Sequence, residues 1–439
     1  MPNLPSLALK CFRELLRFKR YSQVGIVGCL LFLLWLGTGC QAQVKDPGVV
    51  QITLWHGINP PPNRDVFQDL VDRFNQTHPT VQVEAVYIGQ ADQQPPKILT
   101  AVVGNAAPDI LWYNPTITGQ LVELGAIQPL ENWFNQLPIR SNIDPTLLEA
   151  MALDQHLWSV PMATNNLAVF YRPSLFEAAG ITALPETWED FQAVAQRLTR
   201  DDNGDGKIDQ YGLILPLGKG EWTVFSWLPF LFSTADQLIT DDQVNLLNSG
   251  AISALGLWSD LVRSGAAMLS APERGYEQDD FISGKVAMQI TGPWTLEYLE
   301  QTGIDYGVMA IPTHDQRATV VGGEHLFVMK TSPKQEQAAL QFLDYVLSQD
   351  FQGRWSLGTG YLPVNLQTRQ SQQYRDFVAQ QPTLKVFLEQ MNWARSRPII
   401  AGYARLSESL GRSIEAALLG ESPEVALKTA QDRIDLIFN

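Results

Sequence analysis

An alternation of strand-like and helix-like segments over residues 51–113 constrains the fold most. Three short segments are typical of strands, because they are apolar or alternate apolar with polar residues. Two segments between them repeat apolar residues at helical spacing. The order strand, helix, strand, helix, strand predicts a parallel sheet covered by helices. The strand-like segments are residues 51–55, 81–83 and 110–113, and the helix-like segments are residues 66–74 and 98–103.

The same pattern begins again at Leu167. Leu167–Tyr171 and Tyr211–Leu215 are typical of strands, and Thr187 is placed to cap a helix between them. Two such α/β lobes joined by crossing strands would enclose a cleft. Ligands of parallel sheets bind beyond the carboxyl ends of the strands. The residues at those ends in the first lobe are Trp55, His56, Tyr113 and Asn114.

The amino-terminal residues have the layout of a secretory signal peptide. Residues 1–20 carry five basic side chains and one acidic side chain, and the apolar run Val24–Leu36 follows. As a helix that run covers about 20 Å, which is short for a hydrocarbon core of ~30 Å. We expect a signal peptide over residues 1–39, with an uncleaved anchor helix as the alternative. Both place the folded part outside the cytoplasm.

Cys40 follows the small residues 37–39, and this ending resembles the lipobox of bacterial lipoproteins, in which the cysteine is acylated. Gly37 stands where that motif has a branched aliphatic residue. We expect lipidation at Cys40 and a short tether over residues 40–49. Cys11 and Cys29 lie within the signal, so the mature chain would keep one cysteine and form no internal disulfide.

The net charge limits the classes of partner that the mature chain can bind. The whole chain has a net charge of −15, and removing the signal's +4 leaves −15 − 4 = −19. A surface this acidic repels nucleic acid and anionic lipid head groups. Nucleic-acid binding is therefore excluded, whereas neutral or cationic ligands are not repelled.

From Ile52 to about Tyr403 the chain resembles the extracellular solute-binding proteins of the maltose-binding type, the sugar-binding family of bacterial ATP-driven (ABC) importers. Short motifs carry the resemblance by their order and spacing. They include Thr53–Gly57, Phe74–Pro79, Ala107–Ile110, Gly125–Ile127, Thr291–Trp294 and Thr359–Val364.

The resemblance implies an α/β, two-lobe periplasmic-binding-protein fold of type II, with each lobe a mainly parallel sheet flanked by helices. The lobes would be joined by hinge strands and close on one ligand. It also implies a monomer that delivers its ligand to a membrane permease with cytoplasmic ATPase subunits. The expected lobes are residues 50–165 with 312–368, and residues 166–311 with 369–439.

A sugar ring has polar edges and a face of C–H groups, so its sites combine aromatic platforms with hydrogen-bonding side chains. Trp294 is the foremost candidate, because the family's Gly-Pro-Trp segment matches Gly292–Trp294. Burial in an ordinary core is its alternative, and a structural imidazole is the alternative for each histidine candidate. The other candidates are Tyr113, Asn114, His56, Trp222, Glu324, His325, Tyr361, Tyr403 and Arg405.

An acidic loop in the second lobe resembles the first nine positions of an EF-hand calcium loop. Oxygen-bearing residues alternate around Gly206, but Gly212 stands where an EF-hand has its bidentate glutamate. The loop predicts a structural Ca²⁺ site, with an acidic turn without metal as the alternative. The predicted metal ligands are Asp201, Asn203, Asp205, Lys207 and Asp209.

A secreted glycoside hydrolase is the rival class, because such enzymes also have carboxylates in aromatic clefts. Nothing in the sequence places two carboxylates, such as Glu186 and Glu324, across one sugar bond. A sensory partner of a chemoreceptor is a third possibility with the same fold. The sequence does not name the ligand: maltose-like disaccharides, trehalose, glucosylglycerol and glycerol 3-phosphate are all conceivable. The last is disfavoured, because basic residues near the expected site are few (Arg395, Arg397 and Arg405).

Overall fold

The computed structural model describes residues 48–90, 93–240, 243–271 and 276–438. The chain divides at residue 50, and the unit of residues 50–439 is compact. The predicted signal peptide, Cys40 and most of the tether lie outside the described residues. Among the residues described, no helix is long and apolar enough to cross a membrane.

The first sheet has five strands, and its parallel part is the one that the sequence pattern predicts. β1 (Val50–His56) pairs in parallel with β2 (Val81–Tyr87) and with β3 (Ile110–Tyr113). β16 (His325–Val328) runs antiparallel to β3 and to β6 (Val160–Pro161), so the strand order is β2-β1-β3-β16-β6.

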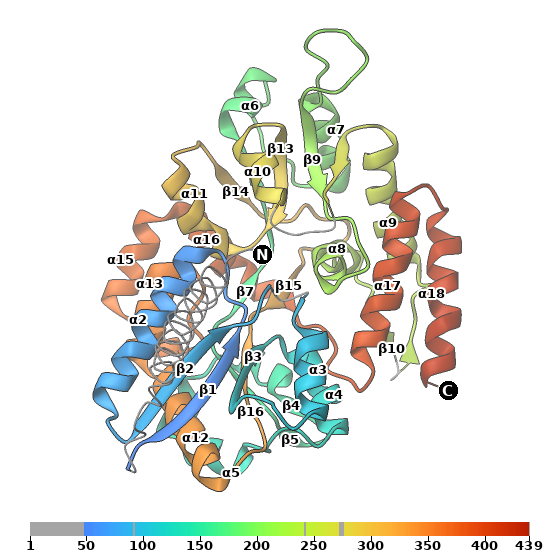
Figure 1. Cartoon of the computed structure of the whole chain (residues 1–439). Coiled ribbons are helices and arrows are strands. Elements are labelled where there is room, and N and C mark those ends of the chain that lie inside the picture. Colours follow the sequence, from blue (N-terminus) through green and yellow to red (C-terminus); the bar gives the residue numbers. More distant parts are fainter. Residues whose placement is uncertain (1–47, 91–92, 241–242, 272–275, 439) are drawn as a thin grey trace, which may run out of the picture. The chain divides into compact units, whose positions relative to one another are not determined.

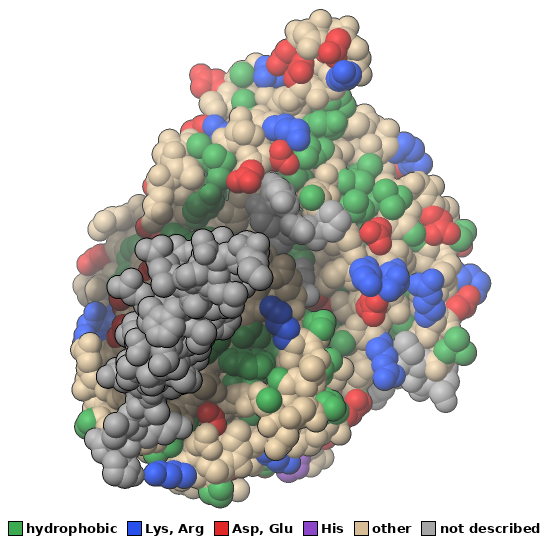
Figure 2. Space-filling view, viewed as in Figure 1, with side chains coloured by type: hydrophobic (Ala, Val, Ile, Leu, Met, Phe, Trp, Pro, Cys, Tyr) green, Lys and Arg blue, Asp and Glu red, His purple; other side chains and the backbone are tan. Residues whose placement is uncertain are grey.

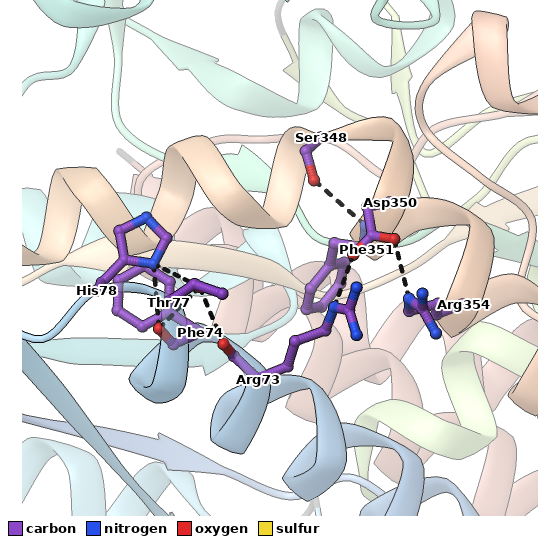
Figure 3. Close-up of polar contacts among 8 residues, drawn as sticks. All are labelled: Arg73, Phe74, Thr77, His78, Ser348, Asp350, Phe351 and Arg354. Carbon is purple, nitrogen blue, oxygen red and sulfur yellow. Dashed lines mark hydrogen bonds and ion pairs between the residues drawn. The ribbon is translucent and has the colours of Figure 1, made fainter.

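Helices α2 (Pro61–Thr77) and α3 (Pro95–Val103) connect the three parallel strands. Each begins with a proline pair, which is tolerated because the first helical N–H groups have no intrahelical partner. α13 (Gln349–Thr359) packs along α2, and in Figure 3 the guanidinium of Arg73 reaches the carboxylate of Asp350 at 3.1 Å. Both side chains are about half exposed, so the pair adds little stability.

The second sheet also has five strands of mixed direction. β9 (Tyr211–Leu215) pairs in parallel with β12 (Ala267–Leu269) and with β13 (Val286–Thr291). β8 (Ala168–Tyr171) is antiparallel to β13 and to β14 (Gly307–Met309). The order is therefore β12-β9-β13-β8-β14.

The helices of this part follow from local sequence signals. α7 (Trp188–Leu198) begins at the predicted cap, because the Thr187 hydroxyl accepts a hydrogen bond from the Asp190 N–H at 3.1 Å. α8 (Glu221–Ser233) is buried on nearly every side, as its lack of a polar face requires. The other helices here are α6 (Pro173–Ala178), α9 (Ser249–Arg263), α10 (Tyr276–Ile282) and α11 (Leu296–Thr302).

A three-stranded sheet joins the two parts, in the order β17-β15-β7, and Figure 1 shows β7 and β15 between the two larger sheets. β15 (Thr319–Gly322) pairs with β7 (Asn165–Asn166) and with β17 (Ala394–Arg395). Neighbouring side chains on a strand point to opposite faces, so Gly322 and its partner Asn165 share one face, and Val321 and Asn166 share the other. We call this sheet the hinge sheet.

The carboxyl-terminal helices divide between the two parts. α12 (Pro333–Leu347) packs on β1 and β16, and α13 on α2, whereas α16 (Pro382–Gln390) packs on β14. α17 (Tyr403–Leu418) packs on α8, α9 and α18 (Pro423–Phe438). The predicted lobe boundaries stay predictions. The remaining α-helices and strands are α4 (Thr118–Glu123), α5 (Glu131–Phe134), α14 (Leu366–Gln370), α15 (Gln372–Gln380), β4 (Ala152–Leu153), β5 (His156–Leu157), β10 (Ile239–Thr240) and β11 (Gln243–Val244).

Candidate functional site

A cleft lies between the two larger sheets, beside the hinge sheet, and its empty space amounts to about 640 Å³, part of it open to solvent. Its walls come from the ends of strands β1, β3 and β13, from the start of α8 and from the hinge sheet. The side chains and backbone that line it belong to Gly57, Asn59, Trp112, Asn114, Asn165, Glu221, Trp222, Phe225, Trp294, Gly322, Gly323, Glu324, Tyr361 and Arg397.

Aromatic rings form a large part of the cleft wall. The ring centroids of Trp222 and Trp294 are 6.1 Å apart with their planes at 72°, and those of Trp294 and Tyr361 are 6.2 Å apart at 38°. These rings come from three separate segments, α8, the turn after β13, and the turn after α13. Such an array offers flat apolar faces with polar N–H and O–H edges, which is the surface that a sugar ring fits.

The segment that carries Trp294 is fixed tightly. A Cβ on Gly292 would lie 2.0 Å from the Trp294 ring, so only glycine allows the indole to fold back there. The Trp294 carbonyl accepts a hydrogen bond from the amide of Asn63 in α2 at 3.2 Å, and Asn63 is fully buried. The ring itself is 5% exposed. Trp294 is therefore held in place from the opposite side of the cleft.

A buried ion pair lies at one end of the cleft. The Arg397 guanidinium is 2.6 Å from a carboxylate oxygen of Glu221, and it lies over the Phe225 ring at 4.6 Å. The Glu221 carboxylate also accepts hydrogen bonds from the hydroxyls of Tyr403, at 3.1 Å, and Ser407. Glu221 is thus fixed by three donors, and its charge is balanced inside the protein.

The pKa values of this cluster reflect that balance. Burial alone would lower the pKa of Arg397, but the adjacent Glu221 carboxylate offsets it and holds the pKa above its ordinary value. Burial, and then the charge of Glu221, raise the pKa of Tyr403 well above the ordinary value for tyrosine. Both side chains therefore keep their protons near neutral pH.

The structure brings half of the predicted ligand-binding set into the cleft wall. Two more residues, Tyr113 and Tyr403, line a depression that adjoins the cleft and shares Asn114 and Glu221 with it. The predicted residues in the cleft wall are Trp294, Asn114, Trp222, Glu324 and Tyr361.

The two predicted histidines are placed differently. His56 lies in the core against the Phe67 ring and accepts a hydrogen bond from the Ile58 N–H at 3.3 Å. Burial, and then the Arg64 charge, lower the pKa of His56 to about 4. His325 is also buried, and its ring is bonded to the Ser159 hydroxyl at 2.8 Å. Burial, and then the charge of Arg397, lower the pKa of His325 to about 3. This geometry favours the structural alternative for both.

Arg405 is exposed and does not line the cleft. Sequence reasoning missed Asn59, Asn165 and Glu221 as cleft residues, and it considered Arg397 only as part of a basic cluster. Asn165 and Arg397 reach the cleft through the hinge sheet and the segment after it, whose long-range pairing leaves no local pattern.

The acidic loop joins α7 to β9 and projects at the top of Figure 1, and Figure 2 shows acidic side chains gathered there. Backbone N–H groups of Gly204 and Gly206 donate to the Asp201 carboxylate at 2.7 and 2.8 Å. The Gly206 bond, the largest influence, lowers the pKa of Asp201. Within the described residues, no three His, Cys, Asp or Glu side chains come together as a metal-ligand group.

Two α/β parts joined by hinge strands around an aromatic cleft are the architecture of a ligand-binding protein. The chain belongs to the bacterial extracellular solute-binding protein family, whose model matches residues 69–385. This confirms the predicted class of protein, and the family consists of binding proteins rather than enzymes. The glycoside hydrolase alternative gains no support.

Relatives in sequence are similar over most of the chain. A Brucella abortus protein described as a binding protein is 26% identical over 323 residues, covering 72% of this chain and 76% of its own. The sn-glycerol-3-phosphate-binding periplasmic protein of Salmonella typhimurium is 22% identical over 405 residues, covering 88% and 92%.

Solved structures confirm the two-lobe α/β fold. A cyclic alpha-maltosyl-1,6-maltose binding protein from Arthrobacter globiformis is 26% identical, with a TM-score of 0.74 over 89% of this chain and 99% of its own. An ABC transporter solute-binding protein from Thermotoga lettingae, bound to alpha-D-tagatose, is 23% identical, with a TM-score of 0.79 over 89% and 100%.

Proposed function

We propose that this protein captures a neutral sugar or polyol in the cleft and delivers it to the permease of an ABC importer. The observation that carries the proposal is the cleft wall itself. Trp222, Trp294 and Tyr361 supply aromatic faces, and Asn59 and Asn165 supply hydrogen-bonding amides. Sugar-binding proteins among the similar structures support the same ligand class.

The charge of the cleft argues for a neutral ligand. Arg397 contributes one positive charge, and Glu221 and Glu324 contribute two negative charges. Because Glu221 is paired with Arg397, an incoming phosphate would have to compete with an ion pair that is already formed. It would also approach a second carboxylate, which like-charge repulsion disfavours.

A glycerol phosphate is the second candidate, and one observation favours it. The Nε of Arg397 is buried and finds no hydrogen-bond acceptor among the described residues. A phosphate oxygen would satisfy that donor, and the Salmonella relative binds sn-glycerol 3-phosphate by its name. A sugar hydroxyl or ring oxygen would satisfy the same donor without adding charge.

A thermal-shift panel separates the two candidates. The purified protein would be melted with mono- and disaccharides, polyols and glycerol 3-phosphate. A ligand at 100 times its dissociation constant adds about 2.7 kcal/mol of stability. A shift with sugars and none with glycerol 3-phosphate supports the proposal, and the reverse pattern refutes it.

We also propose that the mature protein is a monomer anchored outside the cytoplasmic membrane through lipid on Cys40. Support comes from the signal-like residues 1–39 and from the extracellular solute-binding family.

We propose, further, that the loop from Asp201 to Asp209 binds Ca²⁺ as a structural ion. Its support is the alternation of oxygen-bearing residues at the spacing of a calcium loop.

A further inference from the structure

The loop between α7 and β9 contains Asn203–Gly204, which is the only Asn-Gly pair in the sequence. Residues 201–207 are all exposed. Apart from its immediate neighbours, no atom of the described residues lies within 4 Å of the position that a Gly204 Cβ would take. Because glycine has no side chain, nothing hinders the approach of its backbone nitrogen to the amide carbon of the preceding asparagine. The pair is therefore sterically free to react between its own backbone and its own side chain.

The Asn203 side chain is folded over the peptide bond that joins the pair. Its Oδ1 accepts a hydrogen bond from the Asp205 N–H at 2.8 Å, which is the arrangement of an Asx turn. This turn carries the side-chain amide across the nitrogen of Gly204, since that residue lies between the two partners. The Asp205 N–H also stabilises the negative charge that develops on Oδ1 when the amide carbon is attacked. The amide of Asn203 is thus placed and polarised for attack.

A base is positioned on the attacking nitrogen. The Gly204 N–H donates a hydrogen bond to the Asp201 carboxylate at 2.7 Å, and the Gly206 N–H holds the same carboxylate at 2.8 Å. An amide nitrogen becomes a nucleophile as it loses its proton, so a carboxylate bonded to that N–H serves as a general base. One loop therefore supplies the electrophile, the nucleophile and the base of a single reaction.

We propose that Asn203 undergoes spontaneous deamidation, promoted by Asp201 and Gly204 of the same loop. The Gly204 nitrogen forms a bond to the Asn203 Cγ as its proton passes to Asp201. The Cγ–Nδ2 bond then breaks, and the amide nitrogen takes up that proton and leaves as ammonia, so that a succinimide ring closes. Water opens the ring at either carbonyl, which leaves aspartate or isoaspartate at this position. Ammonia is lost and water is gained, so the reaction needs no oxidant.

The reaction changes the charge of the loop. A neutral amide becomes a carboxylate at the third position of the proposed calcium loop, between Asp201 and Asp205. The charge of the oxygen ligands tunes the affinity of such loops for Ca²⁺. The aspartate product therefore adds a charged ligand, whereas isoaspartate lengthens the backbone and displaces the N–H groups that hold Asp201. This consequence rests on the proposed Ca²⁺ site, but the deamidation itself does not.

Prolonged incubation of the purified mature protein at neutral pH, with a chelator present, tests the proposal. Peptide mass spectrometry follows the replacement of NH by O at Asn203, and ammonia is measured in the same samples. Conversion at Asn203 with a matching release of ammonia is the expected result. An Asn203 that stays unchanged would overturn the proposal.

Asn248 is the internal control, because it also precedes a small residue, a serine. Its Oδ1 accepts a hydrogen bond from the Ala251 N–H at 2.7 Å, and its Nδ2 donates to two backbone carbonyl oxygens. The side chain is therefore held at both ends as the cap of α9. Without a base on its nucleophile, Asn248 should convert at least about tenfold more slowly than Asn203. Equal rates at the two positions would contradict the proposal.

Two substitutions of matched size separate the base from a general effect of charge. Asp201→Asn removes the base but keeps an oxygen for the Gly204 N–H, and it should slow conversion of Asn203 at least about tenfold. Asp202→Asn is the matched control, because it removes the same charge from an exposed carboxylate that lies 3.5 Å from Arg200. This control should convert at the wild-type rate. Equal rates in all three proteins, or equal slowing in both variants, would overturn the proposal.

Discussion

At the scale of single residues, Trp294 is the side chain for which a binding role and a folding role most need to be separated. Trp294 is nearly buried, yet its neighbours are other cleft rings, and the Asn63 amide fixes its backbone. A core tryptophan such as Trp258 is instead fully buried within α9 and its packing partners. The two tryptophans are similarly buried, so mutation is needed to show whether their roles differ.

Trp294→Ala should destroy ligand binding more than folding. By analogy with aromatic hot spots, the lost stacking costs roughly 2 to 4 kcal/mol, or about 30- to 1000-fold in affinity. Calorimetry on the variant would measure this, with the unliganded melting curve beside it. Trp258→Ala is the core control and should lose about 3 to 5 kcal/mol of fold stability. A Trp294→Ala protein that melts far below wild type yet keeps its affinity would make Trp294 a core residue.

Glu221→Gln should destabilise the unliganded protein. The substitution leaves the buried Arg397 guanidinium without its counter-ion, and removing one partner of a buried pair costs about 3 to 5 kcal/mol. Denaturant unfolding measures the loss. Asp350→Asn is the matched control, because its ion pairs with Arg73 and Arg354 are exposed and should each be worth under about 1 kcal/mol. Equal stabilities for the two variants would show that the Arg397 charge is not buried in solution.

The two buried histidines predict acid sensitivity. The pKa values of His56 and His325 fall from 6.5 to about 4 and about 3, so the unfolded chain takes up protons first. The free energy of unfolding is therefore highest above pH 6.5, where both histidines are neutral in the folded and the unfolded chain. It falls as the pH drops toward 4, by about 1.4 kcal/mol per pH unit for each histidine. Unfolding free energies measured between pH 7 and 4 should show this slope. His56→Gln should reduce this slope.

At the scale of elements, the sequence predicted the strands and helices whose patterns are local. Residues 51–55, 81–83 and 110–113 lie within β1, β2 and β3, because alternation and apolar runs report burial directly. The sequence pattern did not predict which way the side chains at the strand ends point. His56 shares the buried face of Ile52 and Leu54, so it points into the core under α2 rather than into the cleft. The sequence did not predict Asn165 as a cleft residue, because only its pairing with Gly322 brings it to the cleft.

The acidic loop between α7 and β9 is an element with its own prediction. If it binds Ca²⁺, a chelator should lower the melting temperature of wild type, and Asp205→Ala should abolish that effect. Asp202→Asn, within the loop but outside the predicted ligand set, is the control and should keep the chelator sensitivity. Absence of calcium uptake at millimolar concentration in calorimetry would leave an acidic turn that its own backbone hydrogen bonds stabilise.

At the scale of the whole molecule, the hinge sheet connects the two parts whose facing surfaces form the cleft. The two larger sheets meet through short strands, β7, β15 and β17, so small backbone changes there can rotate one part against the other. Trp222, Trp294 and Tyr361 come from segments far apart in the chain, and Trp294 meets the other two rings only in the folded protein. Sequence motifs predicted Trp294 and Tyr361 as cleft residues. The ion pair between Arg397 and Glu221 could be recognised only in the structure.

The last prediction concerns the anchor of the full chain. In bacterial cells, Cys40→Ser should move the protein from the membrane fraction to the soluble fraction or leave its precursor uncleaved, because the acyl attachment is lost. The charge of the mature part, −19 after −15 − 4, should give the released protein no electrostatic hold on anionic lipids, so release should not depend on salt. Cys29→Ser is the matched control, since Cys29 lies inside the predicted signal and its loss should leave anchoring intact. Mass spectrometry of the wild-type amino terminus should find Cys40 as the acylated first residue. If the Cys40→Ser protein stays in the membrane at full length and wild-type Cys40 is unmodified, the uncleaved anchor helix is the correct interpretation.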